Sequence, residues 1–197
     1  MLSIGLTGGV ATGKSHVRAQ MAALGWSTID ADRLAREVVR PGQPAWREIR
    51  DRFGDAVCGT AGALNRQALG SIVFSDADAR KDLEAIIHPR VYAAIQEWLD
   101  RLAREGAHAI AVADIPLLYE TGHDADFDRV IVVVCTPETQ LQRMMVRDGL
   151  DDTAARQRIA AQWPTADKAA RADIVISTDG SIEETNARVA AVVGQLS

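Results

Sequence analysis

The feature that most restricts the fold of this chain is an eight-residue segment close to its start. Residues Gly8 to Ser15 read GGVATGKS and match the pattern G-x-x-x-x-G-K-[ST]. The segment follows the apolar run Leu2–Leu6 and precedes a stretch of helical character. A glycine-rich turn with a surface lysine is the simpler reading, but the strand before it and the helix after it favour a phosphate-binding loop.

Each position of this loop has an expected role. Glycines let backbone amides approach phosphate oxygens, and the helix that follows offers free N–H groups and a favourable dipole. We expect Lys14 to reach the outer phosphates, the Ser15 hydroxyl to ligate the accompanying Mg²⁺, and His16 to face outward or touch phosphate. The predicted nucleotide-binding residues of the loop are Gly8, Gly9, Val10, Ala11, Thr12, Gly13, Lys14, Ser15 and His16.

Short apolar runs alternate with helical stretches along the chain, which predicts an α/β fold with a parallel sheet. Runs of this kind that are rich in Val and Ile suit strands buried on both faces, and ligands bind at the carboxyl ends of such strands. We predict a single P-loop NTPase-type domain over residues 1–197, with three layers and about five strands. The expected strands are residues 2–6, 26–29, 109–113, 130–134 and 173–176.

Two segments of the chain depart from this alternation of strands and helices. Residues 31–105 exceed what a crossover needs and look helical, with a break expected at His88-Pro89, so we interpret them as a helical substrate-binding insertion. Residues 138–163 are rich in arginine and are predicted to form a helical lid. Arg143 and Arg147 are four residues apart and share one helix face, where they would contact phosphate. Pairing of these arginines with Asp148, Asp151 and Asp152 on the surface is the competing explanation.

Carboxylates follow two of the expected strands. Asp30 and Asp32 come after the second one, and would lie across from the loop if the first two strands were neighbours. Asp32 is a candidate for the base that orients an acceptor hydroxyl, and equally a candidate N-cap of a helix beginning at Arg33. Asp114 ends the third strand and is a candidate Mg²⁺ ligand, directly or through water, although aspartates end strands for many reasons.

The composition of the chain limits the kinds of molecule that it can be expected to bind. The net charge of −5 and the pI near 5.4 give no basic field for nucleic acid or an anionic membrane. Cys58 and Cys135 form no metal-type or disulfide spacing, and no apolar run is long enough to span a bilayer. The chain also begins without the features of a signal peptide. We therefore expect a cytoplasmic monomer that acts on small molecules.

Six segments together make the chain resemble the dephospho-CoA kinase family along nearly its whole length. The loop at 6–15, followed in order by the segment at 29–42 and by DIPLLYE at 114–120, is far more specific to one family than the loop alone. The resemblance implies a P-loop kinase core that uses ATP and Mg²⁺ to phosphorylate the ribose 3′-hydroxyl of dephospho-CoA. The matching segments are LTGGVATGKS at 6–15, IDADRLAREVVRPG at 29–42, LNRQALGSIVF at 64–74, IIHPRV at 86–91, DIPLLYE at 114–120 and TPETQLQRMMVRDG at 136–149.

The resemblance also implies residue roles. Asp32 corresponds to the acceptor-side base, and the lid arginines Arg143 and Arg147 to phosphate and adenine contacts. With Lys14 and Asp32, Arg143 completes the expected catalytic set. Arg66, His88 and Arg90 fall in the family's substrate-binding region.

Three positions depart from the family pattern. Ala11 stands where a glycine is frequent, which narrows the backbone freedom there. His16 replaces the usual threonine with a ring whose charge varies near neutral pH. The segment Ile176–Gly180 lacks an expected asparagine, which bears on the adenine contacts.

Two other functions were weighed. A P-loop kinase acting on a nucleoside or nucleoside monophosphate would turn over those substrates and not dephospho-CoA. A nucleotide-dependent switch is disfavoured, because the chain has no N-K-x-D segment for reading guanine and its insertion resembles a second-substrate site.

Overall fold

The computed structural model describes residues 1–59 and 62–196, so residues 60, 61 and 197 of the expected domain lie outside the described part. The chain divides into two compact units. One joins Met1–Ile29 to Arg101–Ser197, and the other is Asp30–Asp100. Their boundaries lie close to the expected limits of the insertion, residues 31 and 105. For clarity, we call them the sheet unit and the helical unit.

The sheet unit is built around a five-stranded sheet with the strand order β2-β3-β1-β4-β5. The described pairings of β1 with β3, β1 with β4 and β4 with β5 are all parallel. Strand β3 is buried along its whole length, as a strand covered on both faces should be. The strands are β1 Leu2–Gly8, β2 Ser27–Asp30, β3 Ile110–Asp114, β4 Arg129–Val134 and β5 Ile174–Ser177.

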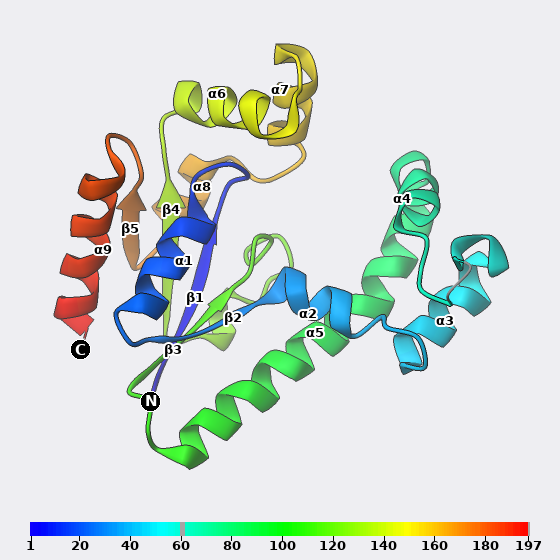
Figure 1. Ribbon diagram of the computed structural model, residues 1–197, viewed down its shortest axis with the longest axis horizontal. Coiled ribbons are helices and arrows are strands. Elements are labelled where there is room, and N and C mark those ends of the chain that lie inside the picture. The colour runs from blue at the N-terminus through cyan, green and yellow to red at the C-terminus, as the bar shows by residue number, and fades with distance from the viewer. Residues whose placement is uncertain (60–61, 197) are drawn as a thin grey trace. The chain divides into compact units, whose positions relative to one another are not determined.

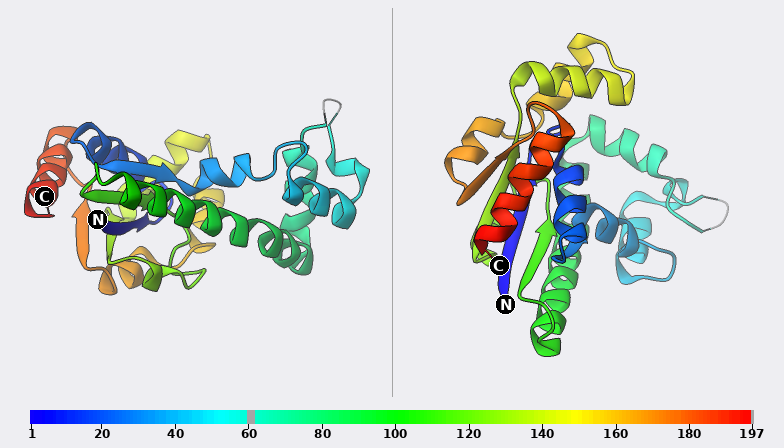
Figure 2. Two further views of the ribbon diagram at one scale, coloured as in Figure 1. Left: turned by 90° about the horizontal axis from the view of Figure 1, so that it is seen from below. Right: turned by 60° about the vertical axis from the view of Figure 1, so that its left-hand side comes forward.

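Side chains of β1 alternate between two different layers. Ile4 and Leu6 are fully buried in the core that helices α1 and α9 complete. Gly5 faces the other way, and a Cβ there would come within 2.7 Å of the Leu118 side chain. The Thr7 hydroxyl donates to the Pro116 carbonyl on that same face. The sheet therefore lies between two covering layers, as the predicted three-layer fold requires (Figures 1 and 2).

Five helices and a 3₁₀ turn lie entirely within the described part of the sheet unit. Helices α1 and α9 contact each other, α8 contacts β4, and α6 packs against α7 (Figure 1). The expected lid, residues 138–163, contains most of α6 and all of α7. The elements are α1 Lys14–Ala23, η2 Asp124–Asp126, α6 Pro137–Asp148, α7 Asp152–Ala160, α8 Thr165–Ala170 and α9 Ile182–Leu196.

The helical unit has a small core of its own. Val39, Ala45, Ile49, Val57 and Leu69 are buried together. Its last helix continues past Asp100 into the sheet unit. The elements are α2 Ala31–Glu37, α3 Pro44–Phe53, η1 Asp55–Val57, α4 Arg66–Ser75 and α5 Ala77–Glu105.

The break expected at His88-Pro89 is wrong, because α5 runs through Pro89 without interruption. A proline inside a helix costs roughly 3 kcal/mol through its missing N–H and its ring. Val91, Ile95 and Leu99 follow at helical spacing and are buried. Burial of such side chains contributes about 1.5–3 kcal/mol each, which is enough to keep the helix continuous.

The sheet order also corrects one expectation about the second strand. Strand β3 lies between β1 and β2, so the strands that lead into the loop and into Asp30 are not neighbours. The neighbour of β1 on that side brings Asp114 instead, in register with Leu6. Among residues 1–59 and 62–196, no helix combines the length and the apolar character needed to cross a bilayer.

Candidate active site

The segment Gly8–Ser15 forms a tight connection between β1, which ends at Gly8, and α1, which begins at Lys14. Two of its glycines are required for different reasons. A Cβ at Gly8 would lie 2.5 Å from the Val133 carbonyl oxygen of the adjacent strand. Gly13 has φ of 87° and precedes the first turn of α1. Ala11 adopts φ of 61°, a conformation that a residue with a Cβ rarely enters.

Lys14 and Asp114 meet at the carboxyl edge of the sheet. The Lys14 ammonium forms an ion pair with Asp114 Oδ1, and Arg18 Nε lies 3.1 Å from Asp114 Oδ2. Asp114 is only 2% exposed, so two cations compensate a buried carboxylate. The edge therefore carries both the positive charge that phosphate needs and a carboxylate next to it.

The loop region contains oxygen donors suited to Mg²⁺. Ser15 follows Lys14 directly and is exposed, while Asp114 contacts Lys14 itself. Within the described residues, no three His, Cys, Asp or Glu side chains gather into a metal-binding group. Mg²⁺ is usually held by one or two protein oxygens plus substrate phosphates, so a sparse donor set of this kind fits a metal that enters with a nucleotide.

His16 faces helix α9 rather than the centre of the loop. Its Nε2 lies 2.8 Å from Asn186 Oδ1, and its backbone N–H donates to the Gly13 carbonyl. The ring thus links α1 to α9. Only its backbone belongs to the loop's own hydrogen bonding.

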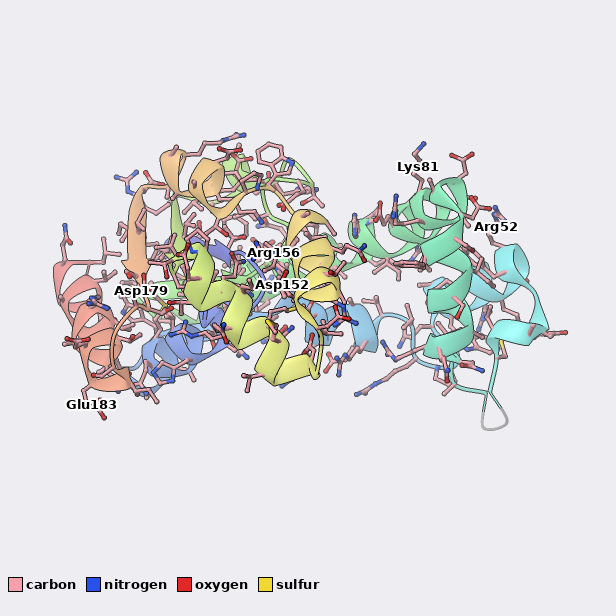
Figure 3. All side chains as sticks on the ribbon, turned by 90° about the horizontal axis from the view of Figure 1, so that it is seen from above. Arg52, Lys81, Asp152, Arg156, Asp179 and Glu183 are labelled. Carbon is pink, nitrogen blue, oxygen red and sulfur yellow. The ribbon has the colours of Figure 1, made fainter. Side chains whose placement is uncertain are left out.

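Most of the lid arginines pair with carboxylates inside the lid. Arg147 Nε and Arg158 Nη1 lie 2.7 and 2.6 Å from Asp148, and Arg156 pairs with Asp152 on α7 (Figure 3). The hydrogen bond from Arg147 lowers the pKa of Asp148, and that same bond raises the pKa of Arg147. The surface-pairing explanation therefore describes these three arginines in the structure. Asp151 has a different role, since it caps α7 by accepting from the Ala154 N–H.

Arg143 points to a different partner, the segment after β5. It donates to both Oγ1 and the carbonyl oxygen of Thr178, each at 2.8 Å. The Thr178 hydroxyl donates in turn to the Thr12 carbonyl at 2.7 Å. Thr178 therefore connects Arg143 to the loop Gly8–Ser15.

Sequence reasoning did not single out Gln140 or Gln162, and it considered Thr178 only as part of the segment Ile176–Gly180. All three contact the loop's backbone. For Gln140 a signal was present, because it lies three residues before Arg143 and so on the same helix face. Gln162 and Thr178 lie in irregular segments, where periodicity gives no guidance.

The expected acceptor-side residues all lie in the helical unit. Asp30 caps α2, since its Oδ1 accepts from the Arg33 N–H at 3.1 Å. The alternative role for Asp32, as N-cap of a helix beginning at Arg33, is therefore wrong. Asp32 is instead an exposed side chain in the first turn of α2.

Three further candidates lie on α4 and α5 of the helical unit. Arg66 is the first residue of α4 and is exposed, and His88 is half-buried on α5. Arg90 donates to Glu48 at 2.6 Å and to the Ile86 carbonyl at 2.5 Å. Arg90 is thus held between α5 and α3, with its side chain about one-third exposed.

A parallel sheet with a G-x-x-x-x-G-K-S loop between its central strand and the following helix defines a P-loop fold. The shikimate kinase of Acinetobacter baumannii has the same fold, with a TM-score of 0.55 at 19% identity over 99% of this chain and 92% of that one. The fold and the loop therefore define the class of the P-loop proteins.

A family model described as dephospho-CoA kinase matches residues 2–184. The dephospho-CoA kinase of Geobacillus kaustophilus is 46% identical over 194 residues, covering 98% of this chain and 96% of that protein. The structure of dephospho-CoA kinase from Campylobacter jejuni superposes with a TM-score of 0.76 at 30% identity, covering 99% of this chain and 96% of that one. The chain belongs to the dephospho-CoA kinase family.

Proposed function

We propose that the chain transfers the γ-phosphoryl group of ATP to the ribose 3′-hydroxyl of dephospho-CoA, giving coenzyme A and ADP, and that the loop Gly8–Ser15 holds the nucleotide. Family membership over residues 2–184 supports the reaction. The structural observation that carries the proposal is the pairing of Lys14 with buried Asp114 beside the exposed Ser15.

On the donor side, we assign the phosphates to the amides of the loop and to Lys14. The first turn of α1 offers the positive end of a helix dipole. Ser15 and Asp114 would hold Mg²⁺, which when bound neutralises charge on the phosphates. Arg143 is the lid residue best placed to add positive charge, because it already reaches the loop through Thr178. Arg147 is assigned to the same task, although Asp148 holds it in this structure.

On the acceptor side, we assign the base to Asp32 and substrate contacts to Arg66, His88 and Arg90. Asp30 already caps α2, so the Asp32 carboxylate is left exposed and available to accept a hydroxyl proton. The guanidinium groups suit the phosphates of dephospho-CoA.

The roles on the two sides are tested by paired variants. Asp32→Asn should slow turnover by about 10²–10⁴-fold with ATP binding close to normal, since an amide cannot take the proton. Asp78→Asn is a matched control, because Asp78 is an exposed carboxylate in the first turn of α5. Lys14→Met should weaken ATP binding and turnover together. Asp32→Asn turning over at the rate of the control would remove Asp32 from the role of base.

Cytoplasmic location and a monomeric state stay predictions of the sequence. Size-exclusion chromatography with light scattering would test the second of these.

A further inference from the structure

The backbone of one loop residue, Val10, is held from both sides by glutamine side chains. Its N–H donates to Gln162 Oε1 and its carbonyl accepts from Gln140 Nε2, each at 2.8 Å. Gln140 lies on α6 and is only 6% exposed, and Gln162 follows α7. We call these two side chains the Val10 clamp. Both come from the lid region and neither belongs to the loop motif.

The clamp packs directly on the loop at Gly9. A Cβ at Gly9 would lie 2.6 Å from Gln140 Nε2 and would also collide with Thr165 Oγ1. A buried amide that loses its partner costs about 1–3 kcal/mol, so these hydrogen bonds hold the glutamines in place as well as the loop.

Both arms of the clamp are anchored. Gln140 shares a helix face with Arg143, whose contact with Thr178 leads to the Thr12 carbonyl. Helix α6 therefore reaches the loop at two points, directly at Val10 and through Thr178 at Thr12.

The anchor of Gln162 lies in the segment that follows β3. The next residue, Trp163, donates its N–H to Glu120 Oε1 at 3.1 Å. Glu120 forms an ion pair at 2.7 Å with Lys168, which is fully buried and also donates to the Pro116 carbonyl. The segment Pro116–Glu120 begins two residues after Asp114, so the arm at Gln162 is linked through Trp163 to the chain just beyond Asp114.

We propose that Gln140 and Gln162 are positioning residues, which set the shape of the phosphate-binding loop from the lid so that lid and loop bind the nucleotide as one unit. The inference rests on the proposed function in one respect, that the nucleotide is ATP. The two glutamines act through the Val10 backbone and touch no reacting atom.

The chemistry of the clamp is asymmetric, and this makes it testable. A backbone N–H can only donate and a carbonyl can only accept, so Gln162 must present oxygen and Gln140 must present nitrogen. Glutamate at position 162 keeps the acceptor. Glutamate at position 140 removes the donor and places carboxylate oxygen against carbonyl oxygen. The same substitution should therefore be tolerated at one position and harmful at the other.

The experiment compares Gln140→Glu, Gln162→Glu and Gln162→Leu by calorimetric binding of ADP and by steady-state kinetics with both substrates. Gln142→Glu on α6 and Gln157→Glu on α7 add the same charge at exposed positions and serve as controls. Gln140→Glu and Gln162→Leu should weaken ADP binding and raise KM for ATP about 5–10-fold, the equivalent of one lost hydrogen bond. Gln162→Glu and both controls should stay within about twofold, and KM for dephospho-CoA should be unchanged throughout.

Equal effects of glutamate at positions 140 and 162, or ADP affinity unchanged in all variants, would overturn the proposal. A merely structural role would lower the melting temperature without this donor and acceptor asymmetry. If Gln140→Glu does not fold, the contrast between Gln162→Leu and Gln162→Glu decides alone. Failure of the wild-type chain to phosphorylate dephospho-CoA would contradict the proposed function. The comparison of ADP binding among the variants would still test the Val10 clamp in that case.

Discussion

Ala11 offers a direct test of how the loop's backbone geometry affects stability. Among the described residues it is the one non-glycine with a positive φ, at 61°. Replacing it with glycine removes the Cβ that disfavours this conformation and leaves the flanking residues unchanged.

The magnitude follows from two opposing effects. An L-residue in the left-handed region costs about 1–2 kcal/mol. Glycine opposes this gain, because it loses more conformational freedom on folding than alanine does, which costs roughly 0.5–1 kcal/mol. The difference predicts that Ala11→Gly stabilises the fold by up to about 1.5 kcal/mol, with about 0.7 kcal/mol at the middle of the two ranges. For a chain of this size, that corresponds to a rise of about 1–4 °C in Tm.

Differential scanning calorimetry of the unliganded chain measures this shift. Ala19→Gly is the matched control, because Ala19 is exposed in the middle of α1. There the same substitution should cost about 0.5–1 kcal/mol and lower Tm. Ala11→Val should destabilise by about 1–3 kcal/mol, because a β-branched residue is strained at this φ. A Tm for Ala11→Gly at or below that of the wild type would refute the reasoning.

Two further predictions concern other parts of the fold. Gly8→Ala should destabilise the chain by about 1–3 kcal/mol in urea unfolding, because the new Cβ meets the Val133 carbonyl oxygen. Gly70→Ala, at an exposed position of α4, is the control and should stabilise the chain by up to about 1 kcal/mol. Unchanged stability of Gly8→Ala would contradict the close approach of Gly8 to Val133. The hydrogen bond from the Thr136 backbone N–H lowers the pKa of Asp179. The ionised carboxylate therefore stabilises the fold above about pH 4, and this stabilisation is lost as the pH falls through the lowered pKa. The contribution is about 1 kcal/mol or less, because water screens a carboxylate that is only half-buried. Urea titrations should show the difference in unfolding free energy between wild type and Asp179→Ala closing below pH 4, and a difference independent of pH would refute the prediction.

The regular part of the fold could be predicted from sequence because burial leaves a periodic signal. Each expected strand lies within two residues of an observed one at both ends, and Asp114 stands at the end of β3 as expected. Parallel strands buried on both faces need continuous apolar runs, and few other segments of the chain supply them.

What could not be predicted depends on which strands and segments become neighbours. The chain gives no local sign that β3 lies between β1 and β2. Whether a proline ends a helix depends on what the rest of that helix buries, which for α5 only the folded core reveals. Asp30 rather than Asp32 caps α2, because the helix begins two residues earlier than its apolar pattern indicates.

Contacts made by side chains in irregular segments were the least predictable. Gln162 and Thr178 each use one hydrogen bond to hold the loop's backbone, across 152 and 166 residues of chain. A single polar residue between helices carries no periodicity, so only the structure could show that these two approach the loop.

The central claim is that the loop Gly8–Ser15 presents ATP for transfer to the 3′-hydroxyl of dephospho-CoA. Incubation of the purified chain with Mg·ATP and dephospho-CoA, followed by mass spectrometry and ³¹P NMR, tests it directly. The account predicts one added phosphoryl group, located at the ribose 3′ position, and its loss in Lys14→Met. Turnover of nucleoside monophosphates with dephospho-CoA left unchanged, or activity that survives Lys14→Met, would contradict it.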